Sequence, residues 1–428
     1  MALELEELKE LHDKAFVYGQ DTRAKASDDL IFYWITHWDD NSLNDSQLAY
    51  RGEFDILRKA GRQILADLSE NPIQVDFEPI NQTRDDAGEV LDGLYRNDDN
   101  RNTSFEAYDI GQQEAVVCGV GAWELTTEYA SYKDSSRDQV IVRLPIHEAN
   151  NKVFWDPNSR LIDKSDAKYC SVLTAYTTEG YQDLVKELTG DEPEDTGQSF
   201  KSPDSSSVFP WKGSNGKFVY ITKFFYRELV KDNLFTLTDP FGQTIQLYES
   251  ALGEAEDDML ESGFSITSKK EMKRYRVTKY IASGDEILSK TVVAGEHIPV
   301  VPIFGERAYI ENEEHYEGVT RLAKDPQRLR DFQLSYLADI VSRSPRQKPI
   351  FWPEQLQGFE AMYSEAGSEN NYPYLLQNRK SALGEEIPIG PVAVMPEQPI
   401  PSALIASISL SKEAVQDVAN PGLPQDIA

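Results

Sequence analysis

Cysteine and histidine are both scarce in this 428-residue sequence. The two cysteines, Cys118 and Cys170, are far apart and each stands in an apolar stretch, so we expect two reduced, buried thiols and a reducing compartment. No pair of histidines has the spacing of metal ligands, although spacing alone leaves open a metal cluster or a Ser/His pair assembled by the fold. We therefore expect no metal and no cofactor. The histidines are His12, His37, His147, His297 and His315.

Recognisable catalytic motifs are missing as well. The sequence contains no P-loop, no GxGxxG turn, no HExxH and no GxSxG nucleophile elbow. The stretch Trp155–Arg160 superficially resembles a calcium loop but lacks its glycine and its final acid, so we predict a turn and keep metal binding as the alternative. The adjacent acids Asp39–Asp40 and Glu385–Glu386 carry no acid/base geometry of their own. These absences favour a protein that is not an enzyme.

Long hydrophobic runs do not occur either. No window approaches 18 apolar residues, and the stretch Met1–Glu7 carries acids where a secretory signal would have bases and an apolar core. We expect a soluble protein of the cytoplasm with no membrane partner.

Basic residues are few relative to acidic ones. There are 43 Lys and Arg against 73 Asp and Glu, which leaves a formal net charge of −30 at pH 7. This charge repels phosphate backbones and so disfavours tight DNA binding. A run from Glu249 to Glu261 contains six acids and no base, which we interpret as a solvated helix face.

Apolar residues are abundant enough, at 40%, for real cores, and the length allows two or three domains. Their pattern is helical near the N-terminus and changes after Trp123 to stretches rich in β-branched and aromatic residues. The expected fold class is α+β, with a mixed N-terminal domain and an exposed polar loop over 191–216. The predicted helical regions are 3–34 and 85–118, interrupted near 97–102, and the predicted strands are 71–77, 140–144, 153–155, 171–177, 218–226 and 275–281.

One predicted strand region is strongly basic. Residues 269–279 carry a net charge of +5, and strand alternation places Lys273, Tyr275 and Val277 on one face. We interpret this region as a solvated or intersubunit edge.

The C-terminal third has a different texture. A helix is predicted from Glu317 to Ser342, with an apolar stripe that includes Leu322, Leu329 and Phe332, and with Pro326 predicting a kink unless the regular helix starts there. Residues 344–399 contain eight prolines and several aromatics, which is typical of a small compact module. A second helix over 401–419 ends at Asn420-Pro421-Gly422, a strong stop signal.

This order of elements, and the residues themselves, resemble the portal proteins of short-tailed enterobacterial phages. The similar segments occur in the same order as in that family and span nearly the whole chain. They are Trp38–Asp40, Tyr50–Asp55, Gly119–Trp123, Asp163–Ala167, Phe209–Trp211, Ala294–Pro299, Phe351–Gln355 and Tyr372–Tyr374.

The resemblance implies a non-enzymatic ring of twelve subunits at one capsid vertex of the virion, assembled in the bacterial host cytoplasm. Its implied partners are double-stranded DNA that passes through without tight binding, the terminase large subunit as packaging motor, the tail adaptor, and the scaffolding and coat proteins. The implied domains are a wing over 1–315, stem helix one over 316–342, a clip over 343–400, stem helix two over 401–419, and the start of a channel loop over 420–428.

In that family the channel loop leads into a long helix, a crown and often a barrel. This sequence stops at Ala428, just inside the expected loop, so we expect no crown or barrel function from these residues. In the loop, Asn420, Pro421, Gly422 and Leu423 are expected to narrow the channel, and an ordinary helix stop explains the same residues without a gate.

Two groups of stem residues are candidate interface or channel residues. The bases of the first helix either pair with acids of a neighbouring subunit, which we favour, or form weak cationic rings facing DNA. Small residues of the second helix suit close helix packing around an axis. The candidates are Arg321, Lys324, Arg328, Arg330, Ala403, Ala406 and Ser407.

The predicted clip contains candidate docking residues. Its aromatics form either a small core or anchors for the motor and the tail adaptor, and the nearby bases are expected to assist docking. The candidates are Arg346, Lys348, Trp352, Phe359, Tyr372 and Tyr374. The alternatives to a portal are another virion ring component, such as a head–tail adaptor or baseplate protein, and an acidic hydrolase.

Overall fold

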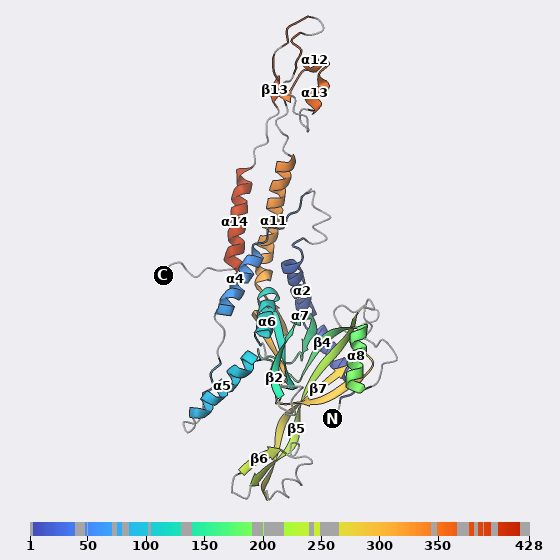
Figure 1. Cartoon of the computed structure of the whole chain (residues 1–428), viewed down its shortest axis with the longest axis vertical. Helices are drawn as coiled ribbons and strands as arrows, with labels where there is room; N and C mark the ends of the chain where they lie inside the picture. Colours follow the sequence, from blue (N-terminus) through green and yellow to red (C-terminus); the bar gives the residue numbers. More distant parts are fainter. Residues whose placement is uncertain are drawn as a thin grey trace. The chain divides into compact units, whose positions relative to one another are not determined.

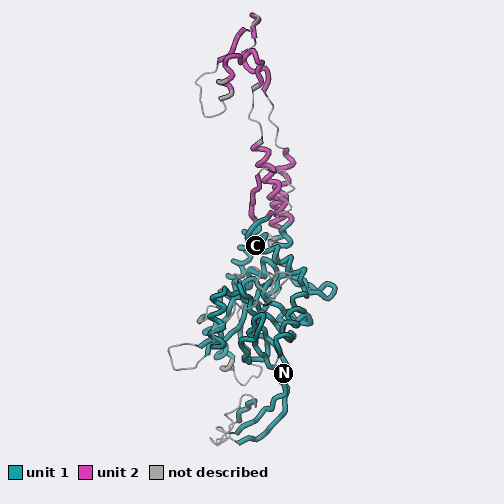
Figure 2. Tube along the Cα trace, turned by 90° about the vertical axis from the view of Figure 1, so that its right-hand side faces the viewer, with its two compact units in different colours: residues 1–37, 57–324, 418–428 teal, residues 38–56, 325–417 magenta. Residues whose placement is uncertain are grey.

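The computed structural model divides the chain into two compact units. The first contains residues 1–37, 57–324 and 418–428, and the second contains 38–56 and 325–417 (Figure 2). This division, at 324/325, differs from the domain boundary predicted at 315/316. The structure describes residues 3–38, 48, 50–70, 75–78, 85–101, 104–129, 139–190, 200, 218–238, 244–248, 265–343, 349–365, 376–380, 384–387, 389–394 and 401–419.

Helices form in both N-terminal regions where the apolar periodicity predicts them. Helix α8 caps its N-terminus with the hydroxyl of Thr177, which accepts a hydrogen bond from the Gly180 amide, and ends at Gly190 in the left-handed conformation. The helices of the first unit before β10 are α1 Leu5–Val17, α2 Gln20–Trp34, α4 Leu57–Glu70, α5 Asp85–Arg101, α6 Ser104–Cys118, α7 Ala149–Lys152 and α8 Thr178–Thr189.

Helix α4 lies in a stretch for which the periodicity predicts no element. A Cβ at Gly61 would lie 2.6 Å from the Tyr33 hydroxyl, so α4 approaches α2 more closely than a larger residue allows. The strand predicted over 71–77 is wrong for its described residues, 75–77. The Phe77 amide donates to Oδ1 of Asp92 on α5, at 2.8 Å, instead of joining a strand ladder.

A three-stranded antiparallel sheet, in the order β2-β1-β9, packs against α6. Its strands are β1 Val120–Tyr129, β2 Gln139–Ile146 and β9 Val300–Phe304. A Cβ at Gly121 of β1 would lie 1.9 Å from the carbonyl oxygen of Gly111 on α6. A residue with a Cβ at position 121 would therefore clash with the backbone of α6.

A second antiparallel sheet has the order β3-β4-β5-β7-β8, with β6 paired to β5. Strands β5 and β7 are far longer than predicted, and Figure 1 shows them extending together beyond the rest of the sheet. Glu124 of β1 joins the two sheets, because its buried carboxylate accepts from Lys223 at 2.7 Å and pairs with Lys279 at 3.7 Å. The strands are β3 Val153–Trp155, β4 Tyr169–Thr177, β5 Phe218–Thr238, β6 Thr244–Tyr248, β7 Ser265–Ala282 and β8 Ile287–Val293.

The sheets and helices bury mixed cores, which confirms the α+β class. In one cluster α8 packs Tyr181 and Val185 against Ile221 of β5. Phe200, which falls in the predicted exposed loop 191–216, is instead fully buried and donates its amide to the Tyr220 carbonyl at 2.8 Å. All other residues of that loop lie outside the described residues, and so does the whole acidic run 249–261.

A short hairpin, β10 Glu306–Ile310 and β11 Glu313–Glu317, leads into the long helix α11, Val319–Arg343. Gly318 separates them, and a Cβ there would lie 2.5 Å from the Val116 and Val117 carbonyl oxygens. The helix predicted over 317–342 is thus present, and it continues through Pro326. The remaining elements are β12 Pro349–Ile350, α12 Pro353–Leu356, α13 Glu360–Glu365, β13 Ala393–Val394 and α14 Ser402–Ala419.

Candidate functional site in helices α11 and α14 and the segment between them

Within the second unit, the buried face of α11 is polar. Gln327, Asp331 and Ser335 follow one another at four-residue intervals and are almost completely buried. Such residues seldom lie in a core unless each has a hydrogen-bond partner. They bond to the backbone of residues 52–56, and Gln327 Nε2 also donates to Asp331 Oδ1 at 3.1 Å.

The three side chains clamp an extended segment. The amides of Gly52, Phe54 and Ile56 donate to Ser335 Oγ at 3.0 Å, Asp331 Oδ1 at 2.8 Å and Gln327 Oε1 at 3.3 Å, respectively. Gln327 also donates from Nε2 to the Phe54 carbonyl, at 3.0 Å. The spacings match, because two extended residues rise about 6.6 Å and four helical residues about 6 Å. The helix therefore replaces a neighbouring strand as the hydrogen-bond partner of this segment.

The opposite face of α11 is apolar and exposed. Leu329 and Phe332 remain 51% and 46% exposed, and the Tyr336 ring stacks on Phe332 with centroids 6.4 Å apart. This orientation is the reverse of an ordinary surface helix, whose apolar stripe faces the core. Helix α11 thus presents its stripe outward.

Helix α14 contacts α11 through polar groups. The Ser411 hydroxyl donates to Gln333 Oε1 at 2.9 Å, and Arg330 reaches the Ile408 carbonyl at 3.5 Å. Of the small residues predicted to pack closely, Ala403 and Ala406 are exposed and Ser407 is half-buried. The large side chains of Ile405 and Leu410 are exposed as well. Helix α14, like α11, leaves an apolar surface uncovered.

The predicted stem bases have different surroundings. Arg321 and Lys324, in the first unit, pair with the buried Asp29 of α2, Arg321 at 2.6 Å and Lys324 at 3.2 Å, and Lys324 also contacts Asp28. Their acids thus belong to the same chain, whereas the sequence interpretation places acids on a neighbouring subunit. Arg328 and Arg330 are half-buried in the second unit.

In the segment between the two helices, Gln355 connects residues that are far apart in the sequence. It is fully buried, accepts from the Trp352 amide at 2.8 Å and donates to the Gly390 carbonyl at 3.2 Å. Trp352 is exposed and Phe359 is half-buried, so neither forms the centre of a core. The other predicted docking and channel-loop residues lie outside the described residues: Arg346, Lys348, Tyr372, Tyr374, Asn420, Pro421, Gly422 and Leu423.

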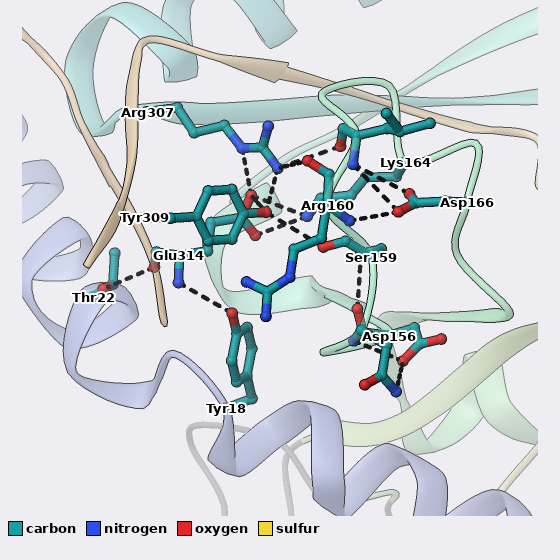
Figure 3. A network of polar contacts seen from close by, with 12 residues as sticks. Tyr18, Thr22, Asp156, Ser159, Arg160, Lys164, Asp166, Arg307, Tyr309 and Glu314 are labelled. Atoms are coloured by element: carbon teal, nitrogen blue, oxygen red, sulfur yellow. Dashed lines mark hydrogen bonds and ion pairs between the residues drawn. The ribbon is translucent and has the colours of Figure 1, made fainter. Parts of the chain in front are cut away.

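Immediately before α11, Glu314 of β11 is the centre of a polar network (Figure 3). Its carboxylate accepts from Lys164 at 2.8 Å, from Arg307 at 2.5 Å and from the Tyr309 hydroxyl at 3.2 Å. Burial lowers the pKa of Lys164 despite the nearby carboxylate, and burial raises the pKa of Tyr309 to about 12. Every group in this cluster has a protein partner, so the cluster is structural.

The same network fixes the hairpin to the corner between α1 and α2. The Glu314 amide donates to the Tyr18 hydroxyl at 3.1 Å, which in turn donates to the Asn312 carbonyl at 3.1 Å. Asp156, drawn nearby in Figure 3, accepts from the Asn158 and Lys168 amides at 3.0 and 3.2 Å. The Asp156 carboxylate thus accepts hydrogen bonds from nearby backbone amides, which agrees with the turn predicted over 155–160.

The structure contains a Ser/His contact, but both residues are buried away from solvent. His12 Nδ1 lies 2.9 Å from Ser171 Oγ, which lies 2.8 Å from Thr222 Oγ1, and all three residues are fully buried. No substrate reaches such a hydroxyl, so the chain of contacts satisfies buried polar groups. Among the described residues there is no cluster of three or more metal-ligating side chains, and no helix is both long and apolar enough to span a membrane.

Comparison with known proteins matches the chain to one family. The family model for phage P22-like portal proteins matches residues 9–423. The chain belongs to this family. The portal protein of Acyrthosiphon pisum secondary endosymbiont phage 1 is 27% identical over 363 residues, which cover 83% of this chain and 49% of that protein. The chain therefore spans about half the length of this curated relative, and the resemblance to phage portal proteins is confirmed.

Sequence reasoning missed the clamp residues of α11 and the acids Asp28 and Asp29. A signal for the clamp is present, since polar residues recur at 327, 331 and 335 on one face of an otherwise amphipathic helix. The acids carry no such signal, because adjacent acids are common on helix surfaces.

Proposed function

We propose that this chain is the subunit of a portal ring of twelve copies at one capsid vertex, through which the phage genome is packaged, retained and released. In this proposal α11 and α14 are the stem helices, the residues between them form the clip, and the first unit forms most of the wing. The chain acts as a conduit and docking platform rather than as an enzyme. Membership of the portal family supports this assignment.

The observation that carries the proposal is the uncovered apolar surface on both helices. Leu329 and Phe332 of α11 and Leu410 of α14 are roughly half exposed or more in the single chain. Burying one such side chain fully contributes about 1.5–3 kcal/mol. If the exposed face of α11 in one chain packs against the exposed face of α14 in the next, the contact is head-to-tail. Head-to-tail contacts form a closed ring when the rotation from one subunit to the next adds up to a full turn.

The charge of the chain suits passage rather than capture of DNA. Twelve copies at −30 carry a formal charge of about −360, so the wall repels a phosphate backbone. Of the bases predicted to face DNA or a neighbour, Arg321 and Lys324 are already paired with acids of their own chain. We place Arg328 and Arg330, which are half-buried in the second unit, at the subunit interface or the channel.

The clip would dock the terminase large subunit during packaging and the tail adaptor afterwards. Trp352 and Ile389 are exposed in this segment, and exposed aromatic side chains are frequent anchors at protein interfaces. We keep Arg346, Lys348, Tyr372 and Tyr374 as docking residues and Asn420–Leu423 as the start of the channel loop. Scaffolding and coat proteins would contact the wing in the virion, after assembly in the host cytoplasm.

Native mass spectrometry and electron microscopy of the purified protein test the proposal. We expect closed rings with a central hole and a mass of about twelve subunits. Only monomers over a wide concentration range would contradict it.

A further inference from the structure

The first unit contains an aromatic, acidic groove that the portal assignment does not explain. It has a volume of about 440 Å³ and lies between α4, α5, α6 and β1. Tyr95, Phe105, Tyr108 and Trp123 contribute rings to its lining, and none of the described residues that line it is Lys or Arg. We call it the α5–α6 groove. The charged residues among its described lining are Asp109 and Asp99, of which Asp99 pairs with Arg143 at 3.7 Å.

Arg143, next to the groove, is a cation held by aromatic rings and carboxylates of this kind. The Arg143 guanidinium lies 5.5 Å from the Tyr95 ring centroid and 6.0 Å from that of Tyr108. It also pairs with Asp98 at 3.2 Å and with Asp99 at 3.7 Å. Aromatic faces beside carboxylates attract cations through both the ring quadrupole and the charge. Tyr95, Tyr108 and Asp99 also line the groove, and Phe105 of the same lining is 63% exposed.

The same unit carries a surface of opposite character on the long strands. We call residues 227–238 of β5 and 265–276 of β7 the β5–β7 arm. On one face of the arm Leu229 stands opposite Tyr275, and both are substantially exposed. The next pair on this face is Lys231 opposite Lys273. Like charges directly opposite in a sheet are destabilising, and Glu271 on the same face offsets part of this repulsion by pairing with Lys231 at 2.8 Å. An acid brought beside Lys273 would offset more of it.

Charge within the arm is only partly neutralised by its own residues. Lys231 pairs with Glu271 at 2.8 Å, Arg274 with Asp232 at 2.9 Å, and Arg276 with Glu228 at 2.6 Å. The arm, with seven bases and three acids over 227–238 and 265–276, nevertheless keeps a net charge of +4 in a chain of −30. The arm is therefore a cationic surface with an exposed leucine and an exposed tyrosine beside its lysines.

We propose that the α5–α6 groove of one chain receives the Leu229, Lys273 and Tyr275 face of the β5–β7 arm of a second copy. The two surfaces complement each other in charge and in apolar character. They are different surfaces of the same unit, so the contact is head-to-tail, as a ring requires. This inference rests on the proposed ring and adds a wing contact to the stem contact.

Site-specific cross-linking tests the contact. Asp109→Cys is placed in one preparation and Lys273→Cys in another, and the two are mixed, assembled and oxidised. Cys118 and Cys170 do not interfere, because both are fully buried and burial raises the pKa of each thiol. We expect covalent dimers in the mixture and none in either preparation alone. Glu179→Cys on α8, mixed with Lys273→Cys, is the matched control and should give no dimer.

The outcomes separate this contact from the ring itself. Rings of normal mass without covalent dimers would overturn the contact and leave the ring intact. A chain carrying both substitutions that cross-links only within itself would also overturn it, because the arm would then occupy its own groove. Monomers without cross-links would overturn both proposals.

A charge exchange provides a second measurement. Lys273→Glu should lower ring yield about fivefold at low salt, and adding Asp109→Lys in the same chain should restore most of it. Equal losses in the single and double variants would contradict the pairing.

Discussion

The Phe54 amide donates a hydrogen bond of 2.8 Å to Oδ1 of Asp331, although 277 residues separate the two in the sequence. The bond belongs to the clamp in which α11 takes the place of a neighbouring strand for residues 52–56. The stability of the second unit depends on these long-range contacts, and two of the side chains that make them, Asp331 and Ser335, are of types that local propensity does not favour in a helix interior.

Removing the Asp331 carboxylate should destabilise the protein. Asp331→Ala leaves the Phe54 amide and Gln327 Nε2 without this acceptor, at an expected cost of about 2–3 kcal/mol. Urea denaturation measures the difference in free energy of unfolding. Asp325→Ala, on the exposed face of the same helix, is the control and should change stability by less than about 0.5 kcal/mol. Equal effects of the two substitutions would show that the clamp contributes nothing.

Reversing the charge of Arg321 should destabilise the single chain and not only an assembly. Arg321→Glu places a carboxylate beside the fully buried Asp29, and breaking a buried pair typically costs about 3–5 kcal/mol. Thermal unfolding under conditions where the protein is monomeric measures the loss. Lys59→Glu on α4 is an exposed control of the same charge change. If Arg321→Glu leaves monomer stability unchanged and only ring yield falls, the base acts between subunits instead.

Charging the exposed stripe should block assembly without unfolding the chain. Phe332→Glu combined with Leu410→Glu places carboxylates on surfaces that are solvated in the monomer and covered in the proposed ring. We expect native mass spectrometry to detect mainly monomers while circular dichroism stays unchanged. Asp325→Asn is the control, and rings of normal yield in the double variant would show that these faces are not the interface.

Free duplex DNA should bind poorly to the purified protein. The net charge of −30 opposes association at physiological ionic strength despite the local bases. Fluorescence anisotropy with a labelled duplex is the measurement. Sub-micromolar binding that weakens as salt is raised would contradict this expectation.

Alkaline pH should destabilise the network around Glu314 through Tyr309. Burial raises the pKa of Tyr309 to about 12 from an ordinary value of 10, so the unfolded chain ionises first. The contribution of Tyr309 to stability is complete below pH 10 and is lost as pH rises from 10 to 12. Urea unfolding of the natural protein and Tyr309→Phe at pH 8, 10 and 11 checks the sign. A stability difference between the two that stays constant over this range would rule out the shift.

Local patterns in the sequence carried much of the secondary structure. Apolar periodicity predicted α1, α2, α5, α6 and α11 near their observed bounds, and β-branched stretches predicted the central strands. The change from helical periodicity to β-branched and aromatic stretches predicted the α+β class, and the colinear segments predicted the portal family. Apolar periodicity did not predict α4. The strand predicted over 71–77 is absent from its described residues, where the Phe77 amide donates to the Asp92 side chain of α5.

The candidate site was less predictable, and α11 shows the reason. The sequence determined that this helix has an apolar face and a polar face, because periodicity depends only on residue order. It did not determine which face is buried, since that depends on whether residues 52–56 come to lie beside Gln327, Asp331 and Ser335. The same holds for Arg321, whose partner Asp29 is 292 positions away along the chain. The tertiary structure alone decided these pairings, because burial makes an unpaired polar group costly and so selects partners by proximity in space.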